Sequence, residues 1–128
     1  MEEQVHYDLD EVLLRPDGIV QINGSNHTYS ASDIRKIHEK VATLSKGKKA
    51  ALLVIGSEYT LIDVDARNYL ASEEAGRYSK AVAYVIRSLA QRIILNFMIK
   101  TKKMPSPTRF FTDTEHAVKW LVQVKVKD

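Results

Sequence analysis

The sequence predicts an α/β fold, a single domain in which an N-terminal β-hairpin joins a mostly parallel sheet covered by about four to five helices. Residues 50–55, Ala-Ala-Leu-Leu-Val-Ile, form an unbroken apolar run that ends at Gly56, which is typical of a central strand buried on both faces. Segments on both sides of this run carry apolar residues at helical spacing. Strands and helices that alternate in this way predict parallel strands joined by right-handed crossovers.

Length and composition fit one domain, residues 1–128, with a core at about residues 5–123. The chain has 128 residues, 45% of them hydrophobic, which is enough to bury roughly two-thirds of the surface that the unfolded chain exposes. Its net charge of +3 comes from 19 basic and 16 acidic side chains spread along the sequence, so nucleic acid is not an expected partner. Cysteine is absent, which excludes disulfides and thiolate metal sites.

The first four residues, MEEQ, are acidic or polar with the exception of the initial methionine, and no apolar run of signal-peptide length follows them. We therefore expect a cytoplasmic protein. The most apolar later window, residues 81–99, is interrupted by Arg87, Arg92 and other polar residues. A membrane span needs about 20 continuously apolar residues, so none is expected here.

In chain order, residues 6–14 are the first predicted strand and residues 19–22 the second. The turn between them, RPDG, has a proline that fixes φ and an Asp-Gly pair that tolerates the left-handed region. A first helix is expected over residues 33–45, because Ser30 and Ser32 are both candidate N-caps and apolar residues at helical spacing follow them.

The second half of the chain continues this alternation. Asp63 is placed to cap a second helix, and Ser72 to cap either a further short helix or a bend before Gly76 and Arg77. Residues 81–86 indicate another buried strand, and Ser88 begins a long helix. A short strand at residues 108–111 follows a Pro-Ser-Pro linker. The next four residues, Thr-Asp-Thr-Glu, match a capping box that opens the last helix.

The order of these elements and the ending TRFFTDTEHAVKWL, residues 108–121, resemble the STAS superfamily, and more closely its SpoIIAA-like members. STAS domains occur in sulfate transporters and in bacterial anti-sigma-factor antagonists. The resemblance covers most of the chain, including Ile62 and Asp63 at the entry to a helix. It implies a single-domain SpoIIAA-like fold and a bacterial protein that acts by binding a partner.

Anti-sigma-factor antagonists carry the pattern Asp-Ser-Ser/Thr-Gly after the central strand, and a kinase phosphorylates its second hydroxyl residue. The matching positions of this chain are Asp63-Val64-Asp65-Ala66. A carboxylate at a helix N-terminus is favourable by about 0.3–1 kcal/mol, but no kinase can switch it. The resemblance therefore implies a regulatory module that lacks the phosphorylation cycle and keeps a permanently acidic partner surface.

An enzyme is not expected. The four histidines never occur at a metal-ligand spacing, so we predict no metal site and no other cofactor. The motifs G-x-S-x-G, G-x-x-x-x-G-K-[ST] and G-x-G-x-x-G are absent. Glu58, Asp63 and Asp65 with Tyr59 could form an acid–base cluster, yet loop solubility and helix capping explain the same residues without catalysis.

The helix that begins at Ser88 has a wide apolar stripe. Such a stripe usually packs one face on the sheet and another on a neighbouring helix or subunit. The SpoIIAA-like group also resembles Sec14-type lipid-binding domains, in which an apolar helix covers a cavity. The alternative function is therefore a small apolar-ligand or lipid-binding protein, in which the helix from Ser88 to Lys100 covers a ligand beneath Ile94, Phe97 and Met98.

The first function hypothesis is a non-catalytic protein-interaction module of STAS type with an unknown protein partner, and a homodimer is an open alternative. Ligands and partners of open α/β sheets meet the carboxyl ends of the strands, so we expect the partner surface after the central strand. Its predicted residues are Tyr59, Thr60, Asp63, Asp65, Arg67 and Asn68.

Overall fold

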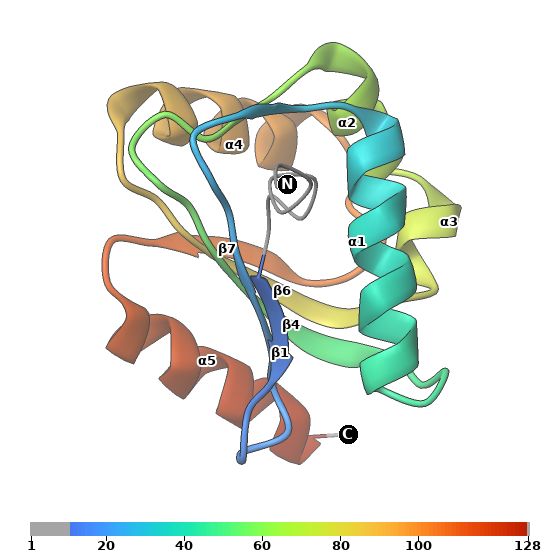
Figure 1. Ribbon diagram of the computed structural model, residues 1–128. Helices are drawn as coiled ribbons and strands as arrows, with labels where there is room; N and C mark the ends of the chain where they lie inside the picture. Colours follow the sequence, from blue (N-terminus) through green and yellow to red (C-terminus); the bar gives the residue numbers. More distant parts are fainter. Residues whose placement is uncertain (1–10, 128) are drawn as a thin grey trace, which may run out of the picture.

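The computed structural model describes residues 11–127, and the side chains of residues 11–124. Its main sheet has five strands, and every neighbouring pair is parallel except the first, which is antiparallel. The third strand in this order lies in the middle of the sheet, as predicted (Figure 1). The strand order is β1 (Glu11–Leu14), β2 (Val20–Asn23), β4 (Ala50–Ile55), β6 (Ser79–Val85) and β7 (Thr108–Phe111).

Within residues 11–127, four helices lie over one face of the sheet and one helix covers the other (Figure 1). None of them has the length and hydrophobicity that crossing a membrane requires. The first four helices are the crossover segments between parallel strands, whereas the last follows the final strand. They are α1 (Ala31–Leu44), α2 (Val64–Leu70), α3 (Glu73–Gly76), α4 (Leu89–Thr101) and, on the opposite face, α5 (Thr114–Lys127).

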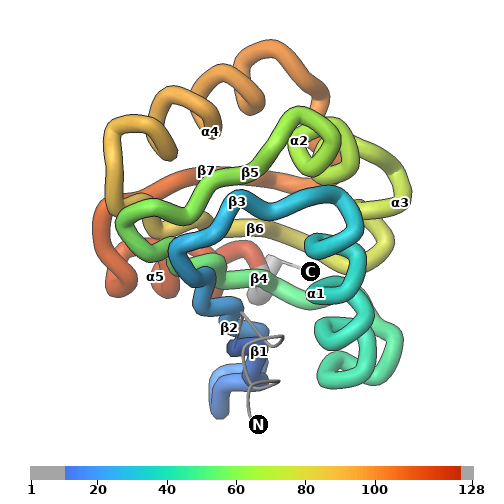
Figure 2. The backbone as a smooth tube through the Cα atoms, turned by 45° about the horizontal axis from the view of Figure 1, so that its top comes forward, coloured from blue at the N-terminus to red at the C-terminus, as the bar shows by residue number. Residues whose placement is uncertain are grey.

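A second, two-stranded sheet that the sequence did not predict lies on the same side as α1 and α4. It consists of β3 (Thr28–Tyr29) and β5 (Leu61–Ile62), which pair in parallel. Figure 1 and Figure 2 show this ribbon in the layer of the covering helices, with α4 on one side of it and α1 on the other. The cover over this face of the sheet is therefore built from short pieces, and it leaves more room than a single packed helix would.

The predicted hairpin is confirmed for the residues that the structure describes, and residues 6–10 of its first strand lie outside them. β1 and β2 pair with Leu14 opposite Val20. Gly18 adopts the left-handed region with φ 86°, and its N–H donates to the carbonyl of Arg15 at 2.9 Å. The Asp-Gly pair thus reverses the chain as the sequence indicates.

The helix starts agree with the predicted caps in most cases. Ser30 and Asp33 form a reciprocal capping box, so α1 begins at Ala31, two residues earlier than expected. Asp63, Ser72 and Ser88 each accept an N–H in the first turn of α2, α3 and α4. The capping box predicted at residues 112–115 is wrong, because Asp113 rather than Thr112 accepts the N–H of His116, at 2.8 Å.

The face of the sheet beneath α5 is sealed. Leu53, Ala81 and Ala83 of the central strands have no exposed surface, and neither do Ala117 and Leu121 of α5. The alanines let the helix lie close to the sheet, so this side has the density of an ordinary protein interior. Any space for a ligand inside the domain must therefore lie on the other face.

Candidate functional site

The loop after the central strand is held by side chains that the sequence assigned to a partner surface. The Thr60 hydroxyl donates to the carbonyl of Ser25 at 2.6 Å and accepts the N–H of Ser57 at 2.9 Å. It therefore joins the loop after β4 to the loop after β2. Thr60 is half-buried, and its two hydrogen bonds hold these loops together at the edge of the sheet.

Asp63 and Arg67 also make bonds within the chain. The Asp63 carboxylate caps α2 by accepting the N–H of Ala66 at 2.8 Å, and the side chain is half-buried. Arg67 donates from Nε to the carbonyl of Ile62 at 3.1 Å. These two residues hold the chain in place between β5 and α2. A partner that contacted them would therefore contact residues that also stabilise the fold.

The other three predicted partner residues are exposed. Tyr59 is 65% exposed, and Asp65 and Asn68 lie on the outer side of α2. Asn68 accepts a hydrogen bond from the Lys102 ammonium at 3.0 Å, which ties α2 to the end of α4. Only Tyr59 and Asp65 thus combine exposure with a side chain that makes no hydrogen bond within the described residues.

A buried glutamine that the sequence analysis missed connects this loop to α4. Gln91 is 8% exposed, and its amide nitrogen donates to the carbonyls of Ser57 at 2.7 Å and Thr60 at 2.9 Å. Its amide oxygen accepts the N–H of Arg87 at 2.6 Å. One side chain therefore satisfies three backbone groups from two loops. An amide side chain inside an apolar helical window was the available signal.

We expect Gln91→Glu to destabilise the protein by about 2–3 kcal/mol at neutral pH, because a carboxylate oxygen would replace the donor that faces two carbonyls. Urea unfolding followed by circular dichroism measures this change. Asn96→Asp, the same exchange at an exposed position of α4, is the matched control. Equal stability of the two variants would contradict this role for Gln91.

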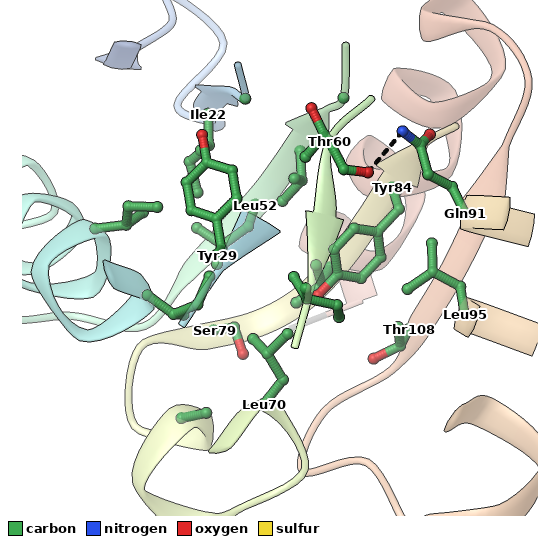
Figure 3. A pocket seen from close by; sticks show the side chains of 18 of the residues that line it. Ile22, Tyr29, Leu52, Thr60, Leu70, Ser79, Tyr84, Gln91, Leu95 and Thr108 are labelled. Atoms are coloured by element: carbon green, nitrogen blue, oxygen red, sulfur yellow. Dashed lines mark hydrogen bonds between the residues drawn. The ribbon is translucent and has the colours of Figure 1, made fainter. Parts of the chain in front are cut away.

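A cavity of about 130 Å³ lies between the main sheet and its cover of helices and ribbon (Figure 3). Among the residues that the structure describes, its lining includes no Asp, Glu, Lys or Arg. Strand residues form its floor, and residues of the ribbon, α1, α2 and α4 form its walls. The apolar lining residues of the floor and of the walls include Ile22, Leu52, Val54, Val82, Ile34, Ile37, Leu61, Ile62, Leu70, Ile94 and Leu95.

The burial of the β6 residues differs between the two faces of the sheet. Its residues alternate between the two faces, and those that point to α5 are fully buried. Val82 and Tyr84 point to the cavity and keep accessible surface, although β6 is an interior strand with helices over both faces. Val54 on the neighbouring strand does the same. The centre of the sheet is therefore packed on one side and left partly uncovered on the other.

Tyr84 stands in the middle of this cavity. Its ring lies between Leu70 and Leu95, with Thr60 and Gln91 on one side (Figure 3). The side chain is half-buried and lines the cavity. Burial raises the pKa of Tyr84 to about 12, so the hydroxyl is protonated at neutral pH.

A second aromatic group, around His38, closes the α1 side of the cavity. His38 lines the cavity, is 4% exposed and shares a 2.7 Å hydrogen bond through Nδ1 with the Tyr69 hydroxyl. Tyr78 stacks on the imidazole with ring centroids 4.7 Å apart. Burial lowers the pKa of His38 to about 4, although Glu74 acts in the opposite direction. His38 is therefore neutral at physiological pH.

The residues predicted to contact an apolar ligand divide into three environments. Ile94 lines the cavity, as expected. Met98 is 1% exposed and packs in a small core cluster with Leu95. Phe97 is 60% exposed and does not line the cavity. The structure thus places only Ile94 of these three residues at the cavity. The apolar stripe of α4 divides into an inner row that is buried in the domain and an outer row that is exposed to solvent.

The comparisons with known proteins add a family. A family model described as Domain of unknown function (DUF7793) matches residues 12–125, which is nearly all of the chain that the structure describes. No curated protein and no solved structure matches the chain.

Proposed function

We propose that this chain, which belongs to the DUF7793 family, is a non-catalytic domain that binds a small neutral apolar molecule between its sheet and α4. The observation that carries the proposal is the cavity of about 130 Å³ over the middle of the sheet. Ligand sites are concave and mostly apolar, with a few polar groups that orient the ligand. Since no charged side chain of residues 11–124 lines this cavity, a charged ligand would lose its hydration without compensation from them.

The size of the cavity limits the ligand. An apolar cavity of about 150 Å³ in a protein core can bind benzene. A cavity of about 130 Å³ therefore suits a molecule of similar size, or a similar-sized portion of a longer one. A bound apolar molecule would gain about 25 cal/mol for each Å² of apolar surface that it removes from water.

The direct test is a titration of the protein with methylenecyclohexane, followed by NMR chemical shifts of backbone amides. We expect saturable binding, with the largest shifts in β4, β6 and the first half of α4. Mass spectrometry of the purified protein after denaturation would show whether it retains a molecule from the cell. Absence of saturable binding, together with a clean mass spectrum, would contradict the proposed function.

A second candidate is a non-catalytic interaction module of STAS type, which acts in the cytoplasm on a protein partner or a second copy of the chain. Specific observations favour it: Tyr59 and Asp65 are exposed beside α2, and the outer row of α4 exposes apolar side chains. Contiguous exposed apolar surface often marks an interaction site. The row consists of Leu89, Ile93 and Phe97, which are 69%, 59% and 60% exposed.

For this candidate we expect Asp65→Arg to abolish capture of a cognate partner in a pull-down, because the substitution reverses an exposed charge at the start of α2. Circular dichroism should show an intact fold. Glu39→Arg, the same charge reversal at an exposed position of α1, is the matched control and should leave capture unchanged. Equal capture by all three proteins would count against Asp65 as a contact.

A further inference from the structure

The polar side chains that line the cavity are, with one exception, already paired. The hydroxyls of Ser79 and Ser106 lie 2.9 Å apart, and the Thr108 hydroxyl donates to the carbonyl of Ser106 at 2.9 Å. The Tyr29 hydroxyl accepts the N–H of Ser25 at 3.0 Å. His38, Thr60 and Gln91 are bonded as described above.

Tyr84 is the exception. Its hydroxyl makes no hydrogen bond within the described residues, although the half-buried side chain lines the cavity. Buried hydroxyl groups are nearly always paired, because leaving one unpaired loses its hydration without return. The unpaired hydroxyl is therefore available to form a hydrogen bond with a ligand in the cavity.

We propose that the ligand carries one hydrogen-bond acceptor, such as a ketone, ester or ether oxygen, which accepts a hydrogen bond from the hydroxyl of Tyr84. This inference rests on the proposed function and narrows its ligand class to neutral apolar molecules with a single oxygen acceptor. The hydroxyl is protonated at neutral pH and is therefore available as a donor. A pure hydrocarbon would fill the space and leave this donor unpaired.

A matched pair of probes tests the inference. Cyclohexanone and methylenecyclohexane have nearly the same shape, but only the ketone has a hydrogen-bond acceptor. Dissociation constants for both probes are measured by NMR titration of the wild-type protein and of Tyr84→Phe. We expect Tyr84→Phe to weaken cyclohexanone binding about two- to tenfold relative to methylenecyclohexane binding. A change of this size corresponds to the loss of one hydrogen bond to the ketone. The carbonyl stretch of bound cyclohexanone should also move to higher frequency in the variant.

Tyr69→Phe is the control for loss of a buried tyrosine hydroxyl. Tyr69 does not line the cavity, and its hydroxyl is already bonded to His38. The control should lower the unfolding temperature and leave the ratio of the two probe affinities unchanged. Tyr84→Phe should keep or raise the unfolding temperature of the unliganded protein, because the hydroxyl that it removes has no partner.

The outcomes separate the inference from the proposed function. If methylenecyclohexane binds and the ratio of affinities is the same in wild type and Tyr84→Phe, the acceptor requirement is overturned and the apolar site stands. If neither probe binds wild type, the proposed function itself fails. A lower unfolding temperature for Tyr84→Phe than for Tyr69→Phe would show that Tyr84 has a structural partner, and would also overturn the inference.

Discussion

Val82→Phe is expected to weaken methylenecyclohexane binding at least tenfold while the protein stays folded. Val82 lies on the floor of the cavity, so a phenyl ring there would occupy much of the volume of about 130 Å³. Because the ring fills existing space, the free energy of unfolding should be equal to that of the wild type or higher. NMR titration and urea unfolding measure the two quantities on one sample.

Val122→Phe is the matched control, the same substitution at a position of α5 that is 40% exposed and far from the cavity lining. It should leave the dissociation constant unchanged. Two results would contradict the account: undiminished binding by Val82→Phe, or a loss of several kcal/mol of stability, which would mean that the space is not there to be filled.

Acidification from pH 6.5 to pH 4 is expected to reduce the free energy of unfolding by roughly 3 kcal/mol through His38 alone. The folded protein holds His38 neutral with a pKa of about 4, whereas the unfolded chain takes up the proton near 6.5. Since the unfolded state binds more protons in this window, the contribution is complete above pH 6.5 and is lost as pH falls toward 4. Urea unfolding at a series of pH values measures the slope.

His38→Gln should flatten this slope, because it removes the buried imidazole. Burial opposes the shift at Asp33, but hydrogen bonds lower the pKa of this carboxyl, and hydrogen bonds from His116 lower the pKa of Asp113. Their loss of stability begins at about pH 5 and continues below the ordinary carboxylate value of 3.8, so the slope between about pH 5 and 6.5 reports mainly on His38. A slope that persists in His38→Gln would mean that another group titrates there.

The fold was largely predictable because its signals are local. The apolar run at residues 50–55 has the composition of a strand buried on both faces, and it became β4 with the predicted bounds. The short strand predicted at residues 108–111 is β7, also with the predicted bounds. Serine and aspartate side chains ahead of amphipathic segments marked the helix starts, since a cap needs only a side chain and the N–H groups that follow it.

The cavity was not predictable, because empty volume depends on packing among elements distant in sequence. Val54 and Val82 look like ordinary strand residues, and only the short ribbon above them explains their accessible surface. Helical spacing also could not separate the two apolar rows of α4, so Phe97 was assigned to the ligand although it faces solvent. Tyr84 gave no signal, since an aromatic residue in a strand is usually core.

A crystal of the protein held under xenon pressure tests the central claim most directly, since xenon binds dry apolar cavities and needs no chemical match. The account predicts a xenon atom bounded by Val54, Tyr84 and Leu95, between the sheet and α4. Diffraction data without xenon at this position, and with side chains packed across the space, would contradict it.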